Sequence, residues 1–183
     1  MAKQRILVVV DYQKDFVDGA LGFESAKNLD NGIASLMKEY AEDENGHIFC
    51  TFDTHGANYL ETQEGKKLPV EHCIEGTEGW ELYGETAMME IMYPMKCTRI
   101  KKPTFGSCEL AKILTLIDNM DGVESITLVG VVTNMCVISN AVIAKAACPE
   151  AEIIIKKELV DSFDKELHQK ALDVMASMQM TIE

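Results

Sequence analysis

The sequence lacks an apolar run long enough to cross a membrane. The first run extends only from Ile6 to Val10 and is followed at once by Asp11, and no other run is longer. The apolar core of a signal peptide or of a membrane-spanning helix needs more residues than this. We therefore expect residues 6–10 to form a buried strand, and we expect no membrane as a partner.

Basic residues are also scarce. The 17 Lys and Arg residues are outnumbered by 30 Asp and Glu residues, which gives a formal net charge of -13. An acidic surface disfavours nucleic acid and anionic membranes as partners. The acidic residues are spread along the chain rather than gathered in a tail, so they predict a solvated surface.

The cysteines lack the spacings that would give them a shared role. The chain has 6 of them, with no CxxC pair and no zinc-finger spacing. Without a secretion signal, a disulfide framework is not expected. We predict free thiols in a reducing cytoplasm, and core packing is the default role of each cysteine.

The sequence shows no repeat, linker or low-complexity tract. With 183 residues, 47% of them hydrophobic, we expect one domain over residues 1–183. Short β-branched runs predict strands at 6–10, 47–52, 96–100, 125–132 and 151–156. Helical spacing predicts helices over 26–41, from Ser107 onward, after Cys136 and over 164–178. This alternation predicts a three-layer α/β/α fold with a mostly parallel central sheet.

Reactive residue types follow the predicted strands. In parallel sheets, ligands bind beyond the carboxyl ends of the strands. Cys136 falls near the start of a helix, where peptide N–H groups lower a thiol's pKa and can hold an oxyanion. Asp11 is a candidate base, and a lysine, Lys102 rather than Lys101, is a candidate electrostatic partner. The competing interpretation is that Cys136 only packs at a helix start.

A second group of polar residues lies in and beside the long loop 54–79. Asp53 and His55 end a predicted strand, and His72 comes later in the loop, with Glu64 or Glu61 as a further carboxylate. Imidazole and carboxylate ligands suit zinc, iron or manganese, and a structureless loop of this length is usually functional. The alternative is that Asp53 caps a turn and the histidines are ordinary surface residues.

Five motifs occur in an order that resembles the isochorismatase-like cysteine hydrolases, whose best-known amidases are the nicotinamidases. These motifs are "VVVDYQKDF", "DTH", "LPVEHCIEGTEGWEL", "KPTFGS" and "GVVTNMCV". The resemblance implies a triad of Asp11, Lys102 and Cys136, with a thioester acyl-enzyme and a proton shuttled by the aspartate. It also implies an oxyanion hole built from the backbone N–H groups of Val132 and Cys136, with a cis peptide between Val131 and Val132.

The resemblance implies a cofactor and a substrate as well. A divalent metal, with zinc preferred over iron or manganese, would be bound by Asp53, His55 and His72, with Glu64 as a fourth ligand. Phe16 and Val131 would contact the substrate, a small amide. The implied reaction converts nicotinamide to nicotinate and ammonia in pyridine nucleotide salvage. Relatives often form homo-oligomers, either dimers or tetramers.

The chain departs from the nicotinamidase pattern near the substrate. No tryptophan lies in "KKLPVEHC", and Asn134 and Met135 stand where an aspartate and an aromatic residue are usual. We expect Asn134 to cap the helix. Two alternatives follow from these departures: a relative that hydrolyses another small amide or an isochorismate-type substrate, and a non-catalytic binding domain that keeps the fold.

Overall fold

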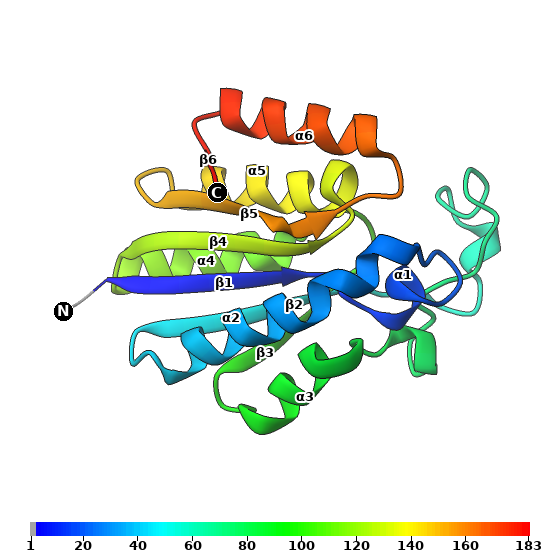
Figure 1. Ribbon diagram of the computed structural model, residues 1–183, viewed down its shortest axis with the longest axis horizontal. Helices are drawn as coiled ribbons and strands as arrows, with labels where there is room; N and C mark the ends of the chain where they lie inside the picture. The colour runs from blue at the N-terminus through cyan, green and yellow to red at the C-terminus, as the bar shows by residue number, and fades with distance from the viewer. Residues whose placement is uncertain (1–2) are drawn as a thin grey trace.

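The structure, a computed structural model, describes residues 3–183 and is built around a parallel six-stranded sheet with the strand order β3-β2-β1-β4-β5-β6 (Figure 1). The strands are β1 (Gln4–Val10), β2 (Gly46–Asp53), β3 (Cys97–Lys102), β4 (Val123–Val131), β5 (Glu152–Asp161) and β6 (Thr181–Ile182). The longer helices are α2 (Asp30–Glu42), α3 (Gly84–Met92), α4 (Cys108–Met120), α5 (Ile138–Ala147) and α6 (Lys165–Ser177). The short helical pieces are α1 (Lys14–Val17), η1 (Glu24–Leu29), η2 (Tyr59–Glu61), η3 (Glu78–Trp80) and η4 (Thr133–Val137).

The central strand β1 shows why both faces of the sheet are covered. Successive side chains of a strand point to opposite faces. Ile6, Val8 and Val10 pack with residues of α4, α5 and α6, whereas Leu7 and Val9 pack with residues of α1, α2 and α3. The sheet therefore lies between two helical layers, and the predicted three-layer α/β/α fold is confirmed.

The predicted elements are present, with shifted ends. The strand predicted at 96–100 runs on to Lys102, and the strand predicted at 151–156 runs on to Asp161. Ser107 caps α4 as expected, because its hydroxyl accepts a hydrogen bond from the N–H of Leu110 at 3.1 Å. No helix in residues 3–183 is long and apolar enough to cross a membrane.

Helix α3 and strand β6 are absent from the sequence expectations. The first turn of α3 is capped from a distance: the Asp30 carboxylate accepts hydrogen bonds from the N–H groups of Glu85 and Thr86, at 2.8 and 2.9 Å. It also accepts one from the hydroxyl of Thr86 at 2.8 Å. Because the cap lies in α2, no local capping pattern marks the start of α3.

Gly130 allows β1 and β4 to come together next to the site. It lies where β4 changes register against β5, and its φ is +106°. A Cβ at this position would lie 2.1 Å from the carbonyl oxygen of Val10. Both the backbone conformation and the space therefore require glycine.

We predict that Gly130→Ala lowers the free energy of unfolding by about 3 kcal/mol, measured by urea denaturation. Gly76→Ala is the matched control, since Gly76 has a φ of +83° but a Cβ there meets nothing within 4 Å. Gly76→Ala should lower the free energy of unfolding by only about 1 kcal/mol, the cost of placing alanine at a positive φ. Equal losses in the two variants would show that the contact with Val10 does not matter.

Candidate active site

The candidate site lies at the carboxyl ends of the four neighbouring strands β3, β2, β1 and β4 (Figure 1). Asp11 follows β1, Asp53 ends β2, Lys102 ends β3, and Cys136 lies in the η4 turn beyond β4. The pairing of β2 with β3 places Asp53 directly beside Lys102. The expectation that the reactive residues gather at one edge of the sheet is therefore confirmed.

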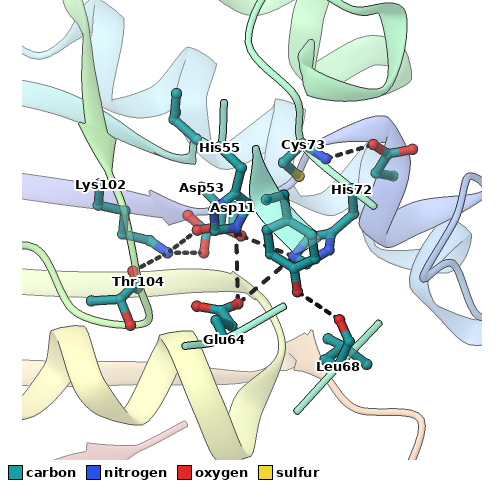
Figure 2. Close-up of polar contacts among 12 residues, drawn as sticks. Asp11, Asp53, His55, Glu64, Leu68, His72, Cys73, Lys102 and Thr104 are labelled. Carbon is teal, nitrogen blue, oxygen red and sulfur yellow. Dashed lines mark hydrogen bonds and ion pairs between the residues drawn. The ribbon is translucent and has the colours of Figure 1, made fainter. Parts of the chain in front are cut away.

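The ammonium of Lys102 is the centre of this group. It lies 2.6 Å from Oδ2 of Asp11 and 3.6 Å from Oδ1 of Asp53. It donates hydrogen bonds to the carbonyl oxygen of Thr104 at 2.9 Å and to Sγ of Cys136 at 3.6 Å. Figure 2 shows Lys102 reaching Asp11 and Thr104. Lys101, the competing lysine, instead points to solvent and pairs with Glu75.

Asp11 is held from its other side by β2. Its Oδ1 accepts a hydrogen bond from the hydroxyl of Thr51 at 2.7 Å, and its backbone N–H donates to the carbonyl and hydroxyl oxygens of Thr51. The side chains of Asp11 and Lys102 are both fully buried. The carboxylate thus has a fixed orientation, with Oδ2 turned toward Lys102.

Burial and charge determine where the protons lie. Burial acts to lower the pKa of Lys102, but its interactions with Asp11, Cys136 and Asp53 outweigh this effect and raise that pKa. Burial raises the pKa of Asp11, and Lys102 only partly offsets this. Lys102 is therefore a permanent cation, and Asp11 is a stronger proton acceptor than an exposed aspartate.

The prediction that the start of a helix lowers the pKa of Cys136 is wrong for the free protein. Burial, followed by the charge of Asp11, raises the pKa of the thiol well above its usual value, and Lys102 opposes this only in part. Cys136 is 6% exposed, so little water reaches a thiolate. The thiol keeps its proton beside a carboxylate that can accept it.

Cys136 lies within a tight turn rather than at the first residue of an ordinary helix. The η4 turn has π-helical geometry, and the N–H groups of Met135 and Val137 both donate to the carbonyl of Val132. The Val131–Val132 peptide is cis, as the resemblance implies. The expected capping by Asn134 is wrong, because its side chain instead accepts a hydrogen bond from the Ser162 hydroxyl at 2.7 Å.

Side chains that the sequence analysis does not identify support this turn. The hydroxyl of Thr133 lies 2.9 Å from Nδ1 of His168 in α6. The amide of Asn140 donates to the carbonyls of Cys136 and Phe105, at 2.8 and 3.0 Å, and so joins the turn to the loop after β3. Thr133, His168 and Asn140 are single polar residues within helical segments, and such a pattern carries no functional signal by itself.

The second predicted group also comes together. One ligand atom from each of Asp53, His55, Glu64 and His72 lies within 4.8 Å of the others. Nε2 of His55 and Nε2 of His72 lie 2.9 and 3.3 Å from Oδ2 of Asp53, and both lie within 3.9 Å of Glu64 (Figure 2). Glu61, the competing carboxylate, is exposed and outside the cluster.

The donor set fits a divalent metal ion. Nδ1 of His72 lies 2.8 Å from the carbonyl of Val70 and donates to it, which leaves Nε2 to face the cluster, as in metal-bound histidines. Although burial opposes it, hydrogen bonds from His55 and His72 hold the pKa of Asp53 far below its usual value. Two imidazoles and two carboxylates, converging and partly buried, suit zinc, iron or manganese.

A cavity of about 400 Å³ opens above these residues. Its wall includes Cys136, Val132 and Phe16, together with the metal-donor residues Asp53, Glu64 and His72. Phe16 thus lies where the resemblance implies. Val131 is fully buried in the core and does not line the cavity, whereas its neighbour Val132 does.

Comparisons with known proteins agree with this geometry. The family model of the isochorismatase domain matches residues 5–183. The chain is similar to the nicotinamidase/pyrazinamidase of Bacillus subtilis, with 26% identity, a TM-score of 0.85 and 98% of each chain covered. It is similar to the pyrazinamidase/nicotinamidase of Streptococcus mutans, with 27% identity, a TM-score of 0.85, and 98% of this chain and 100% of that chain covered.

A third similar structure is the pyrazinamidase of Pyrococcus horikoshii in complex with zinc. It has 26% identity and a TM-score of 0.81, with 98% of each chain covered. No curated protein sequence matches the chain.

We predict that Lys102→Met destabilises the protein by about 3–5 kcal/mol, measured by urea denaturation, because it leaves the buried Asp11 carboxylate without a cation. In this variant Asp11 has a raised pKa in the folded state and a normal one in the unfolded state. The folded state then binds the extra proton, so the loss should grow as pH rises above the ordinary pKa of an aspartate, about 4.

Lys101→Met is the matched control and should cost less than about 1 kcal/mol, since Lys101 forms an exposed ion pair. Adding Asp11→Asn to Lys102→Met should recover part of the loss. The prediction is contradicted if the two lysine variants are equally stable, or if Asp11→Asn makes the Lys102→Met protein weaker still.

Proposed function

The chain belongs to the isochorismatase family, and we propose that it is a cysteine hydrolase that releases ammonia from a small carboxamide, with nicotinamide as the expected substrate. The observation that carries the proposal is the buried ammonium of Lys102, which contacts both the Asp11 carboxylate and the Cys136 thiol. A cysteine that only packs at a helix start does not need a buried ion pair against its sulfur. This contact also argues against a non-catalytic binding domain.

The proposed reaction starts with proton transfer from Cys136 to Asp11. Sγ of Cys136 attacks the amide carbon, and the oxyanion is stabilised by the backbone N–H groups of Val132 and Cys136. Asp11 then gives its proton to the departing nitrogen, ammonia leaves and a thioester remains. Asp11 next removes a proton from water, and the resulting hydroxide attacks the thioester. The C–S bond breaks, the carboxylic acid leaves, and Asp11 returns its proton to the sulfur of Cys136.

Lys102 has an electrostatic role in this scheme. It remains protonated while negative charge moves between Asp11 and Cys136, and its contacts with both make either charge state tolerable in a buried site. Its hydrogen bond to the Thr104 carbonyl keeps the ammonium in place through the cycle.

We propose that Asp53, His55, Glu64 and His72 bind a divalent metal, preferably zinc. When bound, the metal supplies a Lewis acid that holds a ring nitrogen and so orients the substrate. The convergence of the four ligand atoms and the zinc complex of the similar Pyrococcus horikoshii pyrazinamidase support this. Asp53 lies within reach of both Lys102 and the two histidines, so the metal would lie next to the reacting groups.

An isochorismate-type substrate fits the cavity less well. Such a substrate carries carboxylates, which basic side chains usually bind. None of the residues that line the cavity is Lys or Arg. A neutral amide needs no such basic partner. We also propose that residues 1–183 form one hydrolase domain and that the protein is cytoplasmic. We propose that it assembles into a dimer or tetramer, and light scattering after gel filtration measures the subunit count.

We predict that Cys136→Ala lowers ammonia release from nicotinamide by at least about a thousandfold, because it removes the nucleophile. Ammonia is measured with a coupled enzymatic assay, and circular dichroism confirms the fold. Cys108→Ala, at an exposed cysteine, is the matched control and should retain activity. Persistent activity in Cys136→Ala would refute the mechanism.

We predict that His72→Ala weakens zinc binding by at least about tenfold, because it removes one of four converging donors. The protein is stripped with a chelator, dialysed against zinc and analysed by mass spectrometry for bound metal. His47→Ala is the matched control, since His47 lies near the opposite end of β2 and contacts Gln4. Equal zinc content in both variants would argue against this site.

A further inference from the structure

The wall of the cavity is divided by polarity. Its polar side chains are those of Asp53, Glu64 and His72, all of which belong to the proposed metal site. Apart from Cys136, the remaining wall residues are apolar side chains or glycine. Beyond the nucleophile and the metal donors, the wall therefore offers no side-chain hydrogen-bond partner to a ligand.

The cavity also has depth. Its floor is formed by Phe16, Val132 and Cys136, which are between 6% and 8% exposed. Its mouth is formed by Leu68, Phe105 and Phe163, which are 37%, 45% and 59% exposed and come from separate loops. The reaction takes place at the floor, so whatever extends from the amide toward solvent passes these three side chains.

The cavity is of the size that binds small molecules. Its volume of about 400 Å³ lies within the range of small-molecule sites, roughly 300–1,000 Å³. A ligand that places its amide carbon at Cys136 and is longer than one ring extends from the floor toward the mouth. Exposed apolar side chains that converge on such a space are typical of ligand contacts.

Phe163 has one aromatic neighbour. Its ring meets the ring of Phe23 edge to face, with centroids 6.3 Å apart. A side chain that already has a packing partner loses less entropy when a ligand binds. Met135, also in the wall, has an unbranched thioether side chain that adapts to ligand shape.

We propose that the substrate is a neutral carboxamide whose acyl group extends beyond its first ring into an apolar aryl or alkyl group, packed against Leu68, Phe105 and Phe163. This inference rests on the proposed amidase function and adds the substrate class. A polar extension is disfavoured, because a hydroxyl or carboxylate there loses water without gaining a side-chain partner.

The test compares nicotinamide with phenyl-substituted nicotinamides, one for each open ring carbon, and with carboxyphenyl analogues of the same shape. We expect at least one phenyl derivative to have a kcat/KM at least about tenfold above that of nicotinamide, since burying a phenyl group is favourable. The matching carboxyphenyl compound should fall below nicotinamide. If every phenyl derivative is hydrolysed no faster than nicotinamide, the inference is overturned.

Phe163→Ala tests the mouth directly. It should lower the ratio of kcat/KM for the preferred phenyl derivative to that for nicotinamide by about threefold to tenfold. Leu167→Ala is the matched control, because Leu167 is a partly exposed residue of α6 outside the cavity wall, and it should leave this ratio unchanged. A ratio that is the same in both variants would remove Phe163 from the substrate contact and overturn the inference.

If the proposed amidase function is wrong, none of the amides will release ammonia, which distinguishes this outcome from failure of the inference. Calorimetric titration of the Cys136→Ala protein with the same compounds then tests the inference, because the titration measures binding and needs no catalysis. Tighter binding of a phenyl derivative than of nicotinamide supports an apolar extension site. Equal binding overturns it.

Discussion

The buried ammonium of Lys102 is the constraint on which the rest of the site depends. It contacts Asp11, Asp53 and Cys136, which come from the ends of β1 and β2 and from the turn after β4. Burying these charges costs free energy that only close and complete pairing offsets. The register of three neighbouring parallel strands must therefore be correct, and the apolar faces of β1, held between two helical layers, keep it so.

This constraint changes how the cysteine is understood. A helix start alone would favour a thiolate, but here burial and the nearby Asp11 carboxylate dominate, and both favour the protonated thiol. The same burial makes Asp11 a better proton acceptor. With Lys102 fixed as a cation, the thiol and the carboxylate titrate as a coupled pair, and one proton passes between them. The thiol is therefore protonated in the free protein, and the thiolate nucleophile forms only during the reaction.

The parts of the structure that depend on local pattern were predictable from the sequence. The apolar run Ile6 to Val10, the Ser107 cap and the residues that follow each strand all carry local signals. The parts that depend on distant partners were not. Helix α3 is capped by Asp30 of another helix. Asn134 belongs to a residue type that often caps helices, but its side chain is hydrogen-bonded to Ser162 instead. Glu64 and Glu61 are equivalent in sequence, and only the course of the loop separates them.

The η4 turn joins catalysis to substrate choice. Its residues divide between two tasks: Met135 and Cys136 face the cavity, whereas the side chains of Thr133 and Asn134 bond to the connection from β5 to α6 and to α6 itself. That same connection carries Phe163 into the mouth of the cavity. A shift of α6 would therefore move both the nucleophile and the apolar wall. A displacement of about 1 Å can cost a hundredfold in rate, so the hydrogen bonds that join the η4 turn to Ser162 and to His168 of α6 help to keep Cys136 aligned.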